Sequence, residues 1–124
     1  MRVCKLLAAL LGAGFLSSGV LADEYVNGWT ESTFRASVNG CVASAVPRQM
    51  QFMVDSGQLK KDAAQADVDA ARARVTPFVA ATCTCVQQRI MRDIKFEDVP
   101  SIRQRPEYVR QVMTECAAAV VKKK

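Results

Sequence analysis

The sequence predicts an all-α protein: a small, disulfide-stapled bundle of three to four helices that follows a cleaved signal peptide. Three observations lead to this prediction. The 124 residues include only six glycines and four prolines, and no segment shows the sustained alternation of apolar and polar residues that is typical of a strand. An apolar stretch near the N-terminus has the layout of a signal peptide. The cysteines that follow it are even in number, which favours disulfides in a small exported domain.

The first 22 residues have the three parts of a secretory signal peptide. Arg2 and Lys5 give it a positive start, residues 6–16 are apolar, and small residues lead up to Ala22. The apolar run is shorter than the roughly 20 residues needed to span a bilayer. We therefore expect cleavage before Asp23, and a periplasmic or secreted protein without a membrane span in its mature chain.

Cleavage leaves residues 23–124, which we expect to fold as a single helical domain. Loss of Arg2 and Lys5 leaves 15 basic residues against 12 acidic ones, a net charge of +3 instead of +5. This mild charge, without a dense basic block, argues against nucleic-acid binding. A domain of this size buries only about 60–65% of its unfolded surface, so covalent cross-links would add useful stability.

The first helix is predicted over residues 32–55, with its end at Ser56-Gly57. Asn39-Gly40 and Pro47 favour a break or kink within it. Its apolar side is expected to consist of Phe34, Val38, Cys41, Val42, Ala45, Phe52 and Met53.

A second helical region is predicted over residues 59–92. Thr76-Pro77 would suit an N-cap and the first position of a helix, so this region is either one kinked helix or two helices. Pro100 and Pro106 bound a short connection, and the last helix is predicted over residues 106–121. Its inward-facing side chains are expected to be Val109, Val112, Met113, Cys116 and Val120.

Cys4 leaves with the signal peptide, so Cys41, Cys83, Cys85 and Cys116 remain. We expect these four to form two disulfides. At about 100° per residue, Cys83 and Cys85 lie about 160° apart around their helix. They cannot bond each other there, so each must reach a cysteine of another helix. We favour Cys41–Cys83 with Cys85–Cys116, while the crossed pairing remains open because the loops it closes differ by only two residues each.

Cys83 and Cys85 also suggest an alternative function, a thiol-redox protein that uses this pair. An attacking thiolate of low pKa usually lies at a helix N-terminus or beside a cation. These cysteines instead lie well inside a predicted helix, and no thioredoxin-like βαβ pattern surrounds them. We therefore prefer structural disulfides.

No enzymatic activity, metal site or cofactor is expected. The chain has no histidine, which excludes Ser-His-Asp and Cys-His catalytic groups. The cysteine spacing does not match a zinc site, and the methionines are too dispersed for a copper site. There is no glycine-rich phosphate loop, and the carboxylates suit helix caps and solvated faces.

Binding of another, unknown protein is the function that remains. Exported helical domains of this size can act as inhibitors, immunity proteins or envelope-assembly subunits, although fold alone does not decide function. Tyr25 and Trp29 either cover the core or contact a partner, since Tyr and Trp are frequent at interface hot spots. Arg103 and Arg105 form a second candidate interface, with simple solvation as the alternative.

Overall fold

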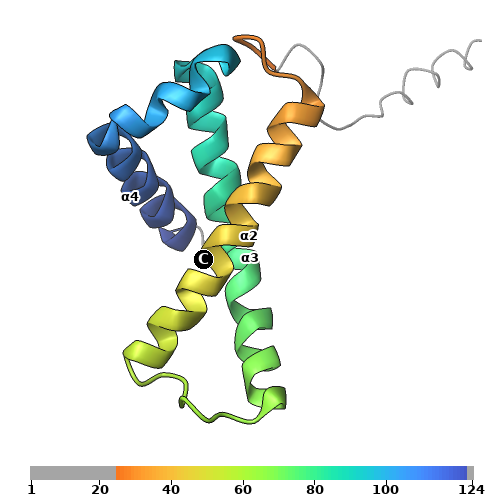
Figure 1. The fold of residues 1–124 in the computed structure, drawn as a ribbon, viewed down its shortest axis with the longest axis vertical. Coiled ribbons are helices and arrows are strands. Elements are labelled where there is room, and N and C mark those ends of the chain that lie inside the picture. The colour runs from red at the N-terminus through yellow and green to blue at the C-terminus, as the bar shows by residue number, and fades with distance from the viewer. Residues whose placement is uncertain (1–24, 123–124) are drawn as a thin grey trace, which may run out of the picture.

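The computed structural model describes residues 25–122, which form helices and loops with no strand among them. The elements in order are α2 (Glu31–Asp55), α3 (Gln65–Asp93), the 3₁₀ segment η2 (Phe96–Gln104) and α4 (Pro106–Lys122). Figure 1 shows that α2 and α3 form an antiparallel hairpin whose helices cross near their midpoints, with α4 beside α3. The predicted all-α bundle is confirmed. The signal peptide predicted over the first 22 residues lies outside the described part of the chain.

The first long helix, α2, is capped as its sequence allows and runs without a break. The Thr30 hydroxyl accepts a hydrogen bond from the Thr33 N–H, and the Thr33 hydroxyl accepts one from the Thr30 N–H, which is a capping box. Of the break or kink expected near Gly40 or Pro47, the break is absent, because α2 is continuous from Glu31 to Asp55. Phe52 was also misplaced on the apolar side, because its side chain is 56% exposed.

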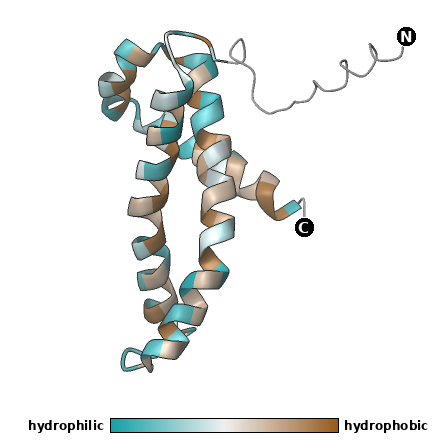
Figure 2. Ribbon diagram, turned by 90° about the vertical axis from the view of Figure 1, so that its right-hand side faces the viewer, coloured by the Kyte–Doolittle hydropathy of each residue, from teal (hydrophilic) through white to brown (hydrophobic). Residues whose placement is uncertain are grey.

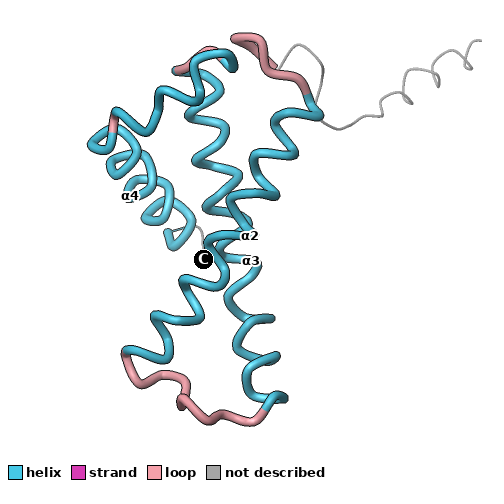
Figure 3. The backbone as a smooth tube through the Cα atoms, in the orientation of Figure 1, coloured by secondary structure: helices cyan, strands magenta, loops and turns pink. Residues whose placement is uncertain are grey.

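The second long helix, α3, continues through Pro77. The Thr76 hydroxyl donates to the Arg72 carbonyl at 2.7 Å, as a threonine inside a helix does, so of the two alternatives a single helix is present and Thr76 is not an N-cap. Residues 59–64, predicted as helix, belong to the loop between α2 and α3 (Figure 3). Pro77 is exposed. The carbonyl that its ring deprives of a hydrogen bond can therefore bond to water, which makes the proline tolerable there.

The core has two parts that meet at Cys83-Thr84-Cys85. The hairpin core lies between α2 and α3 and consists of Val46, Met50, Met53, Ala71, Val79 and Cys83. The upper core joins α3, α4 and the N-terminal turn and consists of Trp29, Val86, Ile90, Met91, Ile94, Val112 and Cys116. Figure 2 shows apolar residues recurring along both long helices and through the last turns of α4.

A tight turn at the start of the described chain closes the upper end of the bundle. Asn27 and Gly28 both have positive φ, 60° and 83°, and the Trp29 N–H donates to the carbonyl of Val26, as in a type I′ turn. The Asn27 side-chain amide donates to the carbonyls of Met91 and Arg92 at 2.8 and 3.0 Å. These carbonyls belong to the last turn of α3, where the helix leaves them without partners of its own. The turn is therefore attached to the end of α3.

Candidate functional site

An apolar groove runs over α3, between α2 on one side and η2 with α4 on the other. Its enclosed part has a volume of about 300 Å³ and adjoins a more open depression of about 660 Å³ beside α4. Ile102, Val109 and Met113 line both parts. We refer to the two parts together as the groove.

The floor of the groove is one face of α3. Val79, Cys83, Val86 and Ile90 follow one another at spacings of four, three and four residues. Side chains at these spacings lie on one face of a helix. The side chains that α3 contributes to the lining are Phe78, Val79, Thr82, Cys83, Val86, Gln87 and Ile90.

The two walls differ in character. The α2 wall consists of Cys41, Ala45, Arg48 and Gln49. The opposite wall consists of Ile102, Arg103, Pro106, Val109, Arg110, Met113 and Thr114. Met113, predicted to face the core, is 43% exposed. That prediction was wrong because α4 presents Val112 and Cys116 to α3 and leaves Met113 on the groove side. A flexible, exposed methionine can adapt to the shape of a bound apolar group.

Both walls are covalently attached to the floor. Cys41 of α2 is bonded to Cys83, and Cys116 of α4 is bonded to Cys85, with Cα–Cα distances of 5.9 and 5.7 Å. The favoured pairing is therefore confirmed, and Cys83 and Cys85 do not bond each other. The Cys41–Cys83 disulfide itself lines the groove. Because the two thiols leave α3 in different directions, one short motif fixes two neighbouring helices.

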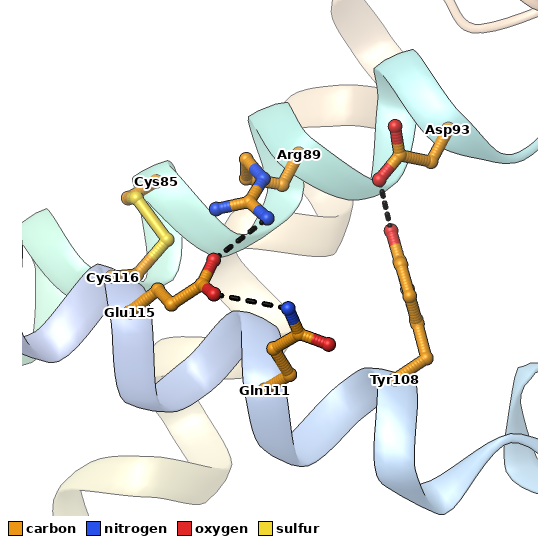
Figure 4. A network of polar contacts seen from close by, with 7 residues as sticks. All are labelled: Cys85, Arg89, Asp93, Tyr108, Gln111, Glu115 and Cys116. Carbon is orange, nitrogen blue, oxygen red and sulfur yellow. Dashed lines mark hydrogen bonds and ion pairs between the residues drawn. A yellow bond between two sulfur atoms is a disulfide. The ribbon is translucent and has the colours of Figure 1, made fainter.

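Polar contacts continue the attachment of α4 to α3 (Figure 4). An Arg89 guanidinium nitrogen lies 2.9 Å from a carboxylate oxygen of Glu115. The Gln111 amide donates to the other Glu115 oxygen at 3.0 Å. Further along, the Tyr108 hydroxyl donates to Asp93 at 2.7 Å. With the Cys85–Cys116 disulfide, these contacts hold α4 along the last turns of α3.

The two shifted pKa values in the described chain belong to these contacts. Burial, followed by the hydrogen bond to Asp93, raises the pKa of Tyr108 to about 12. The hydrogen bond from Gln111, followed by the interaction with Arg89, lowers the pKa of Glu115. Each shift arises where α3 meets α4, and neither group lines the groove. Both side chains therefore help to position α4, and neither of them lies in the groove.

The candidate interface residues from the sequence lie in different surroundings. Trp29 is only 4% exposed, its indole N–H donates to the Ile94 carbonyl at 3.0 Å, and its ring meets Phe96 edge-on. It covers the core, the first of its two expected roles. Tyr25 is half-buried, with its ring centroid 5.8 Å from that of Phe34.

The two candidate arginines also differ. Arg103 lies at the rim of the groove. Arg105 instead stacks over the Tyr108 ring, 5.0 Å from its centroid, in a cation–π contact that further orders the start of α4. The structure thus places one of the four candidate residues on the groove.

Ala45, Arg48 and Arg110 are among the groove residues that were not predicted as interface residues. For two of them a signal was present. Ala45 and Arg48 follow Cys41 by four and seven residues, so they share a helix face with the disulfide. Arg110 carried no such signal, because its place at the groove depends on how α4 packs against η2 and α3.

Within residues 25–122, no three His, Cys, Asp or Glu side chains converge as metal ligands. No helix in this part of the chain is long and apolar enough to cross a membrane.

Comparison of the chain with protein-family models, with curated proteins and with solved structures found no match.

Proposed function

We propose that this is an exported, non-catalytic protein that binds a partner protein in the groove over α3. The groove itself is the observation that carries the proposal. It is lined mainly by apolar side chains between two helical walls, each attached to the floor helix by a disulfide. An apolar surface of this kind, held in shape before binding, reduces the entropy that association would otherwise cost.

The composition of the groove favours binding over catalysis. Its only ionisable side chains are Arg48, Arg103 and Arg110, and arginine stays protonated in proteins. The two cysteines in its lining are bonded to each other. The lining therefore contains neither a general acid or base nor a free thiolate nucleophile, which enzymatic acid–base and covalent catalysis require.

Export fits the same proposal. Two disulfides form between distant parts of the chain, and such bonds persist mainly in the periplasm or outside the cell. An inhibitor, an immunity protein or an envelope-assembly subunit would each work in that compartment and would each need a preformed binding surface.

Site-specific crosslinking in the organism that makes the protein tests the groove. A photoreactive amino acid replaces Met113 in the full chain, and the matched control carries it in place of Ala73, which is exposed on α3 and lies outside the groove lining. We expect a discrete adduct with one envelope protein from position 113 and none from position 73. A second substitution that fills the groove, Ala45→Phe, should abolish the adduct while helix content stays unchanged. Equal adducts at both positions, or an adduct that survives Ala45→Phe, would contradict the proposal.

A further inference from the structure

The charges at the groove are all of one sign. Arg48 lies on the α2 wall, while Arg103 and Arg110 lie on the opposite wall, and no aspartate, glutamate or lysine of residues 25–122 lines either part. All three arginines are exposed. Arg110 forms an ion pair with Glu107. The side chains of Arg48 and Arg103 have no ion pair or hydrogen bond with any other residue in the range 25–122. Arg48 thus borders the part of the groove that lies over α3, while Arg103 and Arg110 border the adjoining depression beside α4.

The length of the groove suits a short helix. Its floor extends from Phe78 to Ile90 along α3, about 18 Å at roughly 1.5 Å per residue. A helix of about 12 residues has this length. An amphipathic helix commonly binds by laying its apolar face between helical walls, with anchors at i, i+3, i+4 and i+7. Among the larger apolar residues of the lining, Met113 is exposed and Phe78, Ile102 and Val109 are partly exposed, so these side chains could contact the apolar face of such a helix.

The segments of this chain that the structure does not describe, residues 1–24 and 123–124, are unsuited to the groove by length or by charge. Residues 1–24 carry two basic side chains, Arg2 and Lys5, and two acidic ones, Asp23 and Glu24; cleavage after Ala22 would leave only the two acidic residues, far fewer than the roughly 12 residues that match the floor. Lys123 and Lys124 are basic and would be repelled by an arginine-lined groove. The charge complementarity instead indicates an occupant that carries carboxylates.

Cations on both walls distinguish an acidic helix from a small anionic amphiphile. A fatty acid has one carboxylate at one end, which could reach the arginine of only one wall at a time. A helix with acidic residues on both sides of its apolar stripe can meet Arg48 on one wall and Arg103 on the other. The groove is also open along the side of α4, where Met113 is exposed, so an alkyl chain there would stay partly in contact with water.

We propose that the occupant of the groove is an amphipathic helix of the partner protein, with acidic residues on both sides of its apolar stripe; this inference rests on the proposed function. The apolar side chains of the helix contact Met113 and the partly exposed Phe78, Ile102 and Val109, and its carboxylates pair with the arginines of the two walls. Steering by these charges would raise the rate of association and make it depend on salt.

Synthetic peptides test the chemistry without knowledge of the partner. One helical peptide of about 14 residues, slightly longer than the floor, carries leucines along one face and glutamates on both flanks. The matched peptide has lysines in place of the glutamates. Binding of each labelled peptide to the oxidised mature protein is followed by fluorescence anisotropy, and the Met113 methyl signal in NMR spectra reports occupation of the groove. We expect the glutamate peptide to bind at least about tenfold more tightly, with an affinity that falls as salt increases.

Charge reversal on the protein provides the decisive comparison. The double substitution Arg48→Glu with Arg103→Glu should weaken binding of the glutamate peptide about tenfold or more and strengthen binding of the lysine peptide. The matched control, Lys60→Glu with Arg74→Glu, makes the same change in net charge at exposed positions outside the groove lining. It should change either affinity less than about twofold. Equal binding of the two peptides, or equal effects of both double variants, would overturn the inference.

Two other kinds of occupant, a small anionic amphiphile and a second copy of this chain, would give different experimental results. Dodecanoate that binds in an arginine-dependent way, while neither peptide binds, would overturn the helix in favour of an anionic amphiphile. Dimerisation in sedimentation velocity that Arg48→Glu abolishes would assign the groove to a second copy of this chain.

The crosslinking experiment separates this inference from the proposed function. A captured partner whose crosslinked segment lacks acidic residues would overturn the acidic helix and leave protein binding at the groove intact. Capture that is equal at positions 113 and 73 would overturn the proposed function, whatever the peptides do.

Discussion

The hydroxyl of Tyr108, in the first turn of α4, donates a 2.7 Å hydrogen bond to the carboxylate of Asp93, the last residue of α3 (Figure 4). The chain between these residues passes through η2, so the bond closes a loop at the upper end of the bundle. It fixes the direction in which α4 returns along α3. The position of the α4 wall of the groove depends on that direction.

Tyr108→Phe should lower the free energy of unfolding by about 1 kcal/mol. A hydrogen bond to a charged group contributes about 1.5–3 kcal/mol, and this one deserves a lower value because Asp93 is exposed to water. Urea denaturation of the oxidised mature protein measures the loss. In a double-mutant cycle with Asp93→Ala, the double variant should be no less stable than Asp93→Ala alone. Additive losses would show that the bond does not form.

The same residue should make stability depend on alkaline pH. The pKa of Tyr108 is raised to about 12 from its ordinary value of 10.0, so the folded state favours the neutral phenol. Its contribution to stability is complete below about pH 10 and is lost as the pH rises toward about 12. Denaturation curves across this range should fall less steeply for Tyr108→Phe than for the parent protein. Parallel curves would contradict the assignment.

Removal of one disulfide should loosen one part of the core more than the other. The bonds join residues 42 and 31 positions apart, and loop entropy gives each about 4 kcal/mol. Cys85→Ser with Cys116→Ser should reduce hydrogen-exchange protection mainly in α4. Cys41→Ser with Cys83→Ser should reduce it mainly in the middle of α2. The same pattern of lost protection in both double variants would contradict the division of the core.

Asn27 should contribute to stability through both its side chain and its backbone conformation. Asn27→Ala loses two hydrogen bonds to the end of α3 and forces alanine to a φ of 60°, and we expect a loss of about 2 kcal/mol. Asn27→Gly accepts that φ readily and loses only the side-chain bonds, so it should cost about 1 kcal/mol. Thermal denaturation compares the two variants. A glycine variant less stable than the alanine variant would rule out the backbone contribution.

Thr82→Val should stabilise the protein by about 1 kcal/mol, because an unsatisfied buried hydroxyl costs about 1–3 kcal/mol. The Thr82 hydroxyl is buried without a hydrogen-bond partner in the described part of the chain. The neighbouring Thr84 is the control, since its hydroxyl donates to the Ala80 carbonyl at 2.9 Å. Thr84→Val should lower stability by about 0.5 kcal/mol. If both variants lose stability in chemical denaturation, Thr82 has a partner that the structure does not contain.

The mature protein should begin at Asp23. The signal-peptide layout before this residue predicts cleavage after Ala22. Intact mass spectrometry of the protein purified from the envelope fraction or the medium measures the N-terminus directly. A chain that retains its first 22 residues there would contradict cleavage.

The sequence by itself determined the properties that depend on neighbouring residues. Helices were predicted in place of strands, and the ends near Asp55, Asp93 and Pro106 were placed within a few residues. The divergence of Cys83 and Cys85 also follows from local geometry, because positions i and i+2 of a helix point apart wherever the helix lies. The sequence did not predict that both long helices are continuous. Proline at positions 47 and 77 disfavours a helix locally, whereas the packing of the two helices along the whole hairpin favours it.

Only the tertiary structure decided the disulfide pairing and the groove. Loop entropy could not select Cys41–Cys83 over the crossed pairing, because the loops are almost equal in length. The pairing is selected by the antiparallel packing of α2 against α3, with α4 on another face of α3. The groove arises because α4 packs on α3 and leaves the space beside α2 open. Arg48 and Met113 both line that space although they are 65 positions apart in the sequence, and no local pattern encodes a distance of that kind.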